Sequence, residues 1–229
     1  MKSKNTHHAS FHSTDPKVYY PVFLNLQNRK AVVIGGGKVA ERKILALLKT
    51  RADIKVISPQ ITQRIKREQL KGGLKHVSRN YRKSDLNNAF LVIAATDSQV
   101  VNEQISQDAP CLVNVVDTPH LCNFIVPSVI RRGPLTIAVS TSGISPALSR
   151  FIRKELENLY RPEFSEYLKV LRSIRTEAMT VIKDLGKRGA LLKSVASDKM
   201  IKMLREKGVI ETKRIAKDLL KKSKSDSNS

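Results

Sequence analysis

A three-glycine turn between an apolar run and an amphipathic stretch constrains this chain more than any other feature. The apolar run at residues 31–34 leads into Gly35, Gly36 and Gly37, and Ala40 takes the third small-residue place of a G-x-G-x-x-A pattern. Glycine lets the backbone turn sharply and lets a pyrophosphate approach the N–H groups at a helix start, where the dipole favours negative charge. Gly35 and Gly37 are therefore candidate dinucleotide-binding residues. The alternative is an ordinary glycine turn between a strand and a helix.

Short apolar runs alternate with amphipathic stretches on both sides of this turn. The runs at 90–96 and 111–116 are continuously apolar, as in strands buried on both faces of a parallel sheet. Strands are expected at residues 31–34, 53–58, 74–78, 90–96 and 111–116, and helices at 39–49, 62–70 and 98–107. This alternation predicts an α/β fold, a Rossmann-like, doubly wound parallel sheet over residues 19–126. In that setting the glycine turn is a nucleotide site.

The carboxyl ends of the strands are where such folds bind ligands, so the residues there are candidates for the site. The second strand ends in Ser58, Pro59 and Gln60, without the acidic residue that usually holds a ribose hydroxyl. The missing acid leaves the choice between NAD and NADP undecided, although no arginine immediately follows this strand to favour a 2′-phosphate. The carboxyl-terminal parts of the fourth and fifth expected strands carry Thr96 and Asn114.

Asp117 directly follows the last buried run of this domain. Its carboxylate can face the nicotinamide end of a cofactor and take a proton there. The alternative is a turn aspartate that hydrogen-bonds the backbone ahead of Pro119.

The pattern changes after Asn123. Two strands, at 124–130 and 135–141, are separated by a charged turn at 131–134 and do not alternate with helices. A helix start follows, with Ser145 as cap and Pro146 at the first helical position. The loop ahead of it, formed by Ser140, Thr141, Ser142 and Gly143, is rich in hydroxyl groups that suit carboxylate or phosphate oxygens. Its alternative role is a helix entry with extra caps.

The rest of the chain is predicted to be a helical C-terminal domain at 161–222. Helices are expected at 164–183, 191–207 and 211–220, with Gly186, Gly189 and Gly208 as breaks. Polar residues at 1–18 and 223–229 are expected to be a disordered extension and a disordered tail.

Charge dominates the composition. The 42 Lys and Arg residues against 20 Asp and Glu give a formal net charge of +22, which favours contact with polyanions. Trp is absent, aromatic residues are 5%, and no zinc-finger spacing occurs, which argues against specific nucleic-acid binding. A nucleotide-sensing module that binds DNA through its basic C-terminal helices stays as a distant alternative.

Other sequence signals point to a cytoplasmic protein without a metal centre. No run approaches the roughly 18 apolar residues of a membrane helix, and the polar start lacks the apolar core of a signal peptide. Cys111 and Cys122 form no C-x-x-C pair, so neither a disulfide framework nor a zinc site is predicted.

Several motifs in order resemble one known family. They are IGGGKVAERK at 34–43, AATD at 94–97, NVVD at 114–117, FIVPSVIRRGPLTIAVST at 124–141 and SGISPALSR at 142–150. Over residues 19–160 the chain resembles the precorrin-2 dehydrogenase module of siroheme synthases, in its stand-alone form. The resemblance implies NAD-dependent oxidation of precorrin-2 to sirohydrochlorin. It also implies a homodimer, with residues 127–160 as a small α+β dimerisation segment. An alternative in the same family adds iron insertion into sirohydrochlorin.

The resemblance also implies roles for particular residues. The nucleotide contacts of the family fall on Lys38, Val39, Pro59 and Gln60, and its catalytic acid falls on Asp117. Its serine-rich loop falls on residues 140–143, where this chain has threonine at a position that is a phosphorylatable serine in some members. Iron insertion needs a carboxylate or an imidazole that removes pyrrole protons, and Asp117 or His120 can do this. The alternative for His120 is a polar loop residue without a role in the chemistry. The substrate carries many carboxylates, which gives the positive charge a use.

Overall fold

The computed structural model describes residues 18–225, which form two compact units that divide between Val126 and Pro127. The predicted N-terminal extension lies almost wholly outside the described residues. Of the predicted C-terminal tail, residues 223–225 belong to the last helix and the others lie outside the description.

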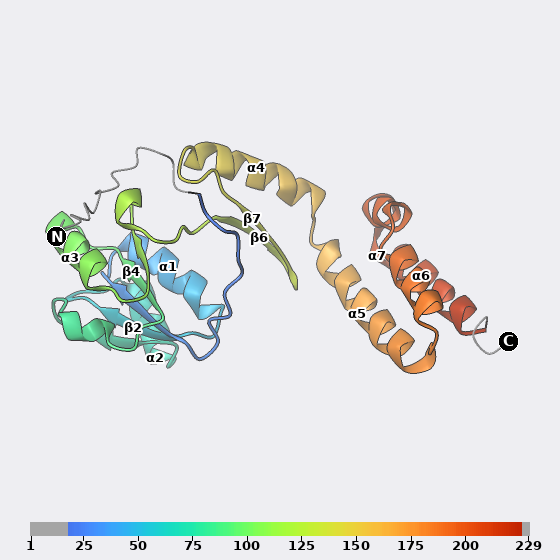
Figure 1. The fold of residues 1–229 in the computed structure, drawn as a ribbon, viewed down its shortest axis with the longest axis horizontal. Helices are drawn as coiled ribbons and strands as arrows, with labels where there is room; N and C mark the ends of the chain where they lie inside the picture. Colours follow the sequence, from blue (N-terminus) through green and yellow to red (C-terminus); the bar gives the residue numbers. More distant parts are fainter. Residues whose placement is uncertain (1–17, 226–229) are drawn as a thin grey trace, which may run out of the picture. The chain divides into compact units, whose positions relative to one another are not determined.

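The first unit is the predicted parallel sheet with helices on its faces (Figure 1). Its strands run in the order β3-β2-β1-β4-β5, so the chain winds first to one side of β1 and then to the other. The strands are β1 (Lys30–Ile34), β2 (Asp53–Ile57), β3 (Lys75–Val77), β4 (Leu91–Ala94) and β5 (Leu112–Val115). The α-helices are α1 (Lys38–Leu48), α2 (Gln63–Leu70) and α3 (Gln99–Asp108), and the 3₁₀ helices are η1 (Lys83–Leu86) and η2 (Pro119–Leu121). The reversal between β1 and β4 creates a crevice at the carboxyl ends of these strands.

Alternate side chains of the strands feed two apolar cores. On β1, Ala31 and Val33 join the core that contains Ile44 of α1, whereas Val32 and Ile34 join the core that contains Ile105 of α3. Both faces of the sheet are thus covered, as the continuous apolar runs predict.

Hydroxyl side chains cap the starts of two helices of this unit. Thr62 caps α2 by accepting from the N–H of Ile65, and Ser98 caps α3 by accepting from the N–H of Val101. Before β1, residues 18–26 have no regular structure, and Leu26 is buried in the core.

The second unit begins with an antiparallel pair of strands, β6 (Ser128–Arg132) and β7 (Leu135–Val139). The expected strand at 124–130 was placed too early, because Phe124 packs against the first unit's core and Pro127 has no N–H for a ladder. Arg131 and Arg132 belong to β6 rather than to the turn, which Gly133 makes with a φ of 59°. The helix α4 (Pro146–Leu159) follows, capped by Ser145 as predicted.

Three helices complete this unit around their own apolar core: α5 (Glu163–Val181), α6 (Leu185–Val195) and α7 (Asp198–Ser225) (Figure 1). The prediction of breaks at Gly186 and Gly189 was wrong. Both glycines lie inside α6. Asp184 caps the start of this helix by accepting from the N–H of Lys187, and Leu191 and Val195 bury its C-terminal half, so the helix forms across both glycines. The break at Gly208 is confirmed by a φ of 78° that interrupts α7. Within residues 18–225, no helix is long and apolar enough to cross a membrane.

Candidate functional site

A pocket of about 770 Å³ opens in the first unit where β1, β2 and β4 end. Six of the predicted cofactor residues line it: Gly35, Gly37, Ser58, Pro59, Gln60 and Thr96. The other two, Lys38 and Val39, are the first residues of α1 and do not belong to the lining. Six of the eight predicted cofactor residues thus lie together around one pocket, and their role in binding a cofactor stays a prediction.

The three glycines bring backbone segments close together. A Cβ atom on Gly35 would lie 2.1 Å from the carbonyl oxygen of Ala95, and one on Gly36 would lie 1.9 Å from that of Gln60. The φ of Gly35 is +119°, a conformation that side chains disfavour. Around Gly37 no atom lies within 4 Å of such a Cβ, so this glycine leaves open space. Sequence reasoning did not single out Gly36, whose constraint is a contact with a distant loop.

Gly37 is also the N-cap residue of α1. It has no side chain that could accept hydrogen bonds from the N–H groups of the first turn. A phosphate accepts such bonds in place of a capping side chain, and the helix dipole favours its charge. This cradle fits the pyrophosphate of a dinucleotide.

Hydrogen bonds within the loop after β2 fix its shape. The Ser58 hydroxyl donates to the carbonyl of Gln60 at 2.6 Å, and the Ser78 hydroxyl donates to that of Pro59 at 3.0 Å. The Ser58 side chain thus shapes the wall of the pocket.

The loop after β4 is fixed in a similar way. The Thr96 hydroxyl lies 2.8 Å from the Asn102 side-chain oxygen, and the Asn102 amide donates back to the Thr96 carbonyl at 3.0 Å. Asn102 is buried in the first turn of α3, so it ties the helix start to the lip of the pocket.

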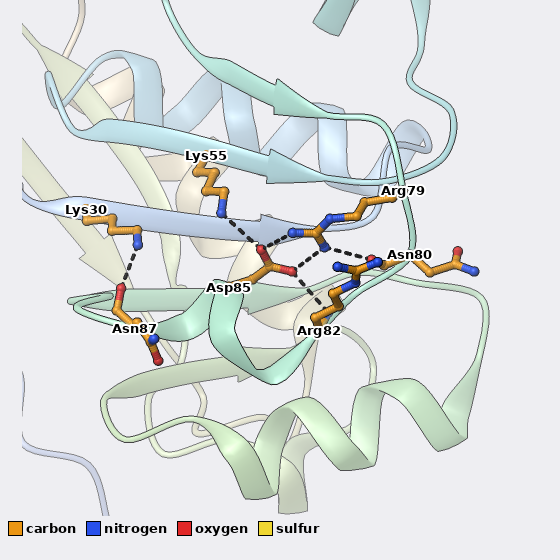
Figure 2. A network of polar contacts seen from close by, with 7 residues as sticks. All are labelled: Lys30, Lys55, Arg79, Asn80, Arg82, Asp85 and Asn87. Atoms are coloured by element: carbon orange, nitrogen blue, oxygen red, sulfur yellow. Dashed lines mark hydrogen bonds and ion pairs between the residues drawn. The ribbon is translucent and has the colours of Figure 1, made fainter.

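A second wall of the pocket comes from Arg79, Asn80 and Tyr81, which follow β3. Figure 2 shows Arg79 directed toward Asp85, whose carboxylate is 1% exposed. Both guanidinium ends donate to this carboxylate at 2.7 Å. These bonds hold the pKa of Asp85 well below its usual range, although burial opposes them. Sequence reasoning missed this wall, since it considered only arginines directly after β2. The signal available was that β3 pairs with β2 in the sheet.

Asp117 lies at the end of β5, exposed to solvent, with a φ of 58°. It is not among the residues that line the pocket. Lys43 of α1 lies close enough to interact with it electrostatically. Burial and then Arg42 lower the pKa of Lys43, while the negative charge of Asp117 raises it.

Asn114 is buried beside the end of β5, and its amide donates to the carbonyl of Phe124 at 3.1 Å. Val115, which follows Asn114 on β5, donates its N–H to the sulfur of Cys122 at 3.2 Å. These contacts link β5 to the segment that follows it. A substrate role for Asn114 stays a prediction.

In the second unit, Thr141 organises the loop that precedes α4. Its hydroxyl lies 3.0 Å from both the N–H and the carbonyl oxygen of Ser145, and 3.1 Å from the hydroxyl of Ser149. The hydroxyl of Ser140 accepts from the N–H of Ser142 at 3.0 Å. Ser142 and Gly143 both have positive φ angles. The roles predicted for these four residues in binding substrate stay predictions.

No cluster of three or more His, Cys, Asp or Glu side chains suited to a metal ion occurs between residues 18 and 225. His120 lies exposed in η2, next to the turn that contains Asp117.

Comparison with known proteins follows the same division of the chain. Residues 22–128 match a family described as putative NAD(P)-binding, and residues 132–159 match the sirohaem biosynthesis protein central family. A siroheme synthase of Photobacterium profundum is 44% identical over 144 residues, which cover 62% of this chain and 31% of that protein. A siroheme synthase of Psychrobacter cryohalolentis is 36% identical over 190 residues, 81% of this chain and 36% of that protein.

The chain spans about a third of the length of these curated relatives. Among solved structures, SirC, a precorrin-2 dehydrogenase, superimposes with a TM-score of 0.77 and 26% identity. The match covers 89% of this chain and 100% of that one. The likeness therefore extends over both units and supports a nicotinamide cofactor for the pocket of the first.

Proposed function

We propose that this chain oxidises precorrin-2 to sirohydrochlorin with NAD. The ground is that it belongs to the family of precorrin-2 dehydrogenases and siroheme synthase N-terminal modules. The observation that carries the proposal is the glycine-lined pocket at the point where the sheet reverses, in a chain whose fold is that of a precorrin-2 dehydrogenase. The reaction removes two hydrogens from the substrate, one as a hydride and one as a proton.

The residues of the pocket fit a dinucleotide. The backbone N–H groups of Gly37, Lys38 and Val39 would hold the pyrophosphate at the start of α1. The loop Ser58–Gln60 would bound the adenosine, and Thr96 would lie beside the half of the dinucleotide that reaches toward β4 and β5. When bound, the nicotinamide ring supplies the hydride acceptor.

Asp117 would take the proton that leaves with the hydride. Its carboxylate is exposed at a strand end and has the Lys43 ammonium group in its neighbourhood. A carboxylate in this place can also stabilise the positive charge that develops on the macrocycle as the hydride leaves.

Substrate carboxylates need cations and hydroxyl donors. The net charge of +22 provides long-range attraction for a polycarboxylate. We assign local contacts to Asn114 and to the loop Ser140–Gly143, whose Ser140 and Ser142 side chains are exposed.

The protein would act as a homodimer in the cytoplasm. Leu148, Phe151 and Leu159 lie on one face of α4 and are 48%, 59% and 48% exposed. Apolar side chains on one helix face, left in water, are the kind of surface that a second copy of the chain buries.

A turnover assay tests the proposal. Purified protein with NAD should convert precorrin-2 to sirohydrochlorin, and Asp117→Ala should lower kcat by about 100-fold or more, because general-base catalysis contributes that much. Asp53→Ala is the matched control, since Asp53 is an exposed carboxylate at the opposite end of a strand. Equal activity of the Asp117 variant and the wild type would contradict the assignment. Parallel reactions of sirohydrochlorin with ferrous iron would show whether the bifunctional alternative holds.

A further inference from the structure

We propose that Asp85 makes the pocket selective for NAD over NADP by holding Arg79, so that Arg79 does not serve as a binding group for a 2′-phosphate. This inference rests on the nucleotide chemistry proposed above and adds the residue pair that sets its specificity. Arg79 is the one lysine or arginine among the described residues lining the pocket. An arginine at the adenosine end is the usual partner of a 2′-phosphate in this kind of fold.

Arg79 is already engaged within the protein. Its Nη1 donates to Asp85 Oδ2 at 2.7 Å and to the carbonyl of Asn80 at 2.9 Å, and its Nη2 donates to Asp85 Oδ1 at 2.7 Å. A paired, fork-like contact of this kind is both strong and directional. It aligns the guanidinium with the carboxylate and uses three of its five N–H donors.

Burial of the Asp85 carboxylate stabilises its contact with Arg79. Its carboxylate is 1% exposed, and its remaining contacts are the Lys55 ammonium at 3.0 Å and the N–H of Arg82 at 3.0 Å (Figure 2). Turning Arg79 toward a ligand phosphate would leave this buried charge without its main partner. Breaking a buried ion pair from one side costs far more than the pair itself contributes.

Asp85 also reduces the positive charge that this wall offers to a ligand. Its carboxylate contacts two cations, Arg79 and Lys55, so the three groups together carry one positive charge instead of two. This weakens their attraction for the two negative charges that a 2′-phosphate would bring, whereas the 2′-hydroxyl of NAD brings none. Lys30 donates instead to the carbonyl of Asn87 at 2.6 Å (Figure 2).

The test measures the dissociation constants of NAD and NADP by calorimetry on the full chain. The wild type should bind NAD more tightly than NADP. Asp85→Asn keeps an acceptor oxygen but removes the negative charge, so the NADP-to-NAD affinity ratio should rise by about tenfold, as expected for one new charged hydrogen bond. The double variant Asp85→Asn with Arg79→Leu should lose this gain. A folded Asp85→Asn protein with the wild-type ratio would overturn the proposal.

Arg79→Leu alone keeps the proposal open to refutation if Asp85→Asn does not fold. It leaves Lys55 and the Arg82 N–H on the carboxylate. If Arg79 is held as described, this variant should change the affinity ratio by less than about threefold. A selective loss of NADP affinity of about tenfold would show that Arg79 reaches the phosphate in the wild type, which would overturn the inference.

The two proposals fail in different ways. If the wild type turns over precorrin-2 equally well with NAD and NADP, the proposed role of Arg79 and Asp85 in cofactor selectivity is refuted, whereas the proposed dehydrogenase activity stands. A wild type that binds neither nucleotide and shows no turnover would remove both.

Discussion

Three consecutive glycines at the end of β1 differ in what surrounds them. Gly35 and Gly36 face carbonyl oxygens of other loops at distances that admit no Cβ atom, whereas Gly37 faces open space. The first two permit the backbone to pack, and the third permits a ligand to approach. The two requirements can be separated by experiment.

Gly36→Ala should lower the free energy of unfolding by about 3 kcal/mol, because the added methyl group overlaps backbone that cannot rotate away. Gly37→Ala should leave the thermal unfolding temperature close to that of the wild type, because its φ of −79° suits alanine, but should weaken NAD binding by about tenfold. Thermal denaturation and NAD titration of both variants check this. The same stability loss in both, with unchanged affinity, would contradict the separation.

Some site residues could be predicted individually and others could not. Gly35, Gly37 and the loop Ser58–Gln60 follow strand ends, so local pattern places them in the pocket. Arg79 and Asp85 are only six residues apart, but they meet through the irregular turn between β3 and η1, which a strand or helix pattern does not encode.

At the scale of elements, alternation and caps predicted the sheet and its helices, whereas glycine positions predicted helix ends poorly. Gly186 and Gly189 lie within α6 because burial of Leu191 and Val195 outweighs the propensity cost of about 1 kcal/mol for each glycine. Gly208 does interrupt α7, with a positive φ. Tertiary packing decides such cases, and a single sequence does not show it.

The exposed apolar face of α4 yields a prediction on assembly. Leu148→Glu should weaken a homodimer by at least about tenfold, since it places a charge among side chains that a partner would bury. Arg150→Glu is the control, because residue 150 is an exposed position on the opposite side of the same helix. Analytical ultracentrifugation would measure both. Dimerisation of the Leu148 variant with wild-type affinity would exclude this face.

For the whole molecule, the net charge of +22 says more about the kind of partner than about the fold. Such a charge favours contact with polyanions, and the polycarboxylate substrate proposed for this chain is one. The predicted change from alternating to antiparallel pattern falls near the division at Val126. Residues 127–160 and 161–222, which the sequence predicts as separate parts, both lie within the second compact unit.

Salt should therefore act on substrate capture. Between low and high ionic strength, the KM for precorrin-2 should rise about fivefold with little change in kcat, as screening weakens attraction between charged groups. The KM for NAD, which carries fewer charges, should rise less. Steady-state kinetics at increasing sodium chloride concentrations measure both KM values. A KM for precorrin-2 that does not change with salt would contradict a role of long-range electrostatic attraction in substrate binding.

The buried position of Cys122 beside β5 gives the first unit an internal reporter. Cys122 as a residue is 6% exposed, and its sulfur lies 3.2 Å from the backbone nitrogen of Val115, whereas Cys111 is more accessible. Alkylating reagents should therefore label Cys111 first and reach Cys122 only when the strand edge opens. The ratio of the two labelling rates then measures how often this part of the sheet opens under native conditions, and a bound nucleotide should slow the second rate.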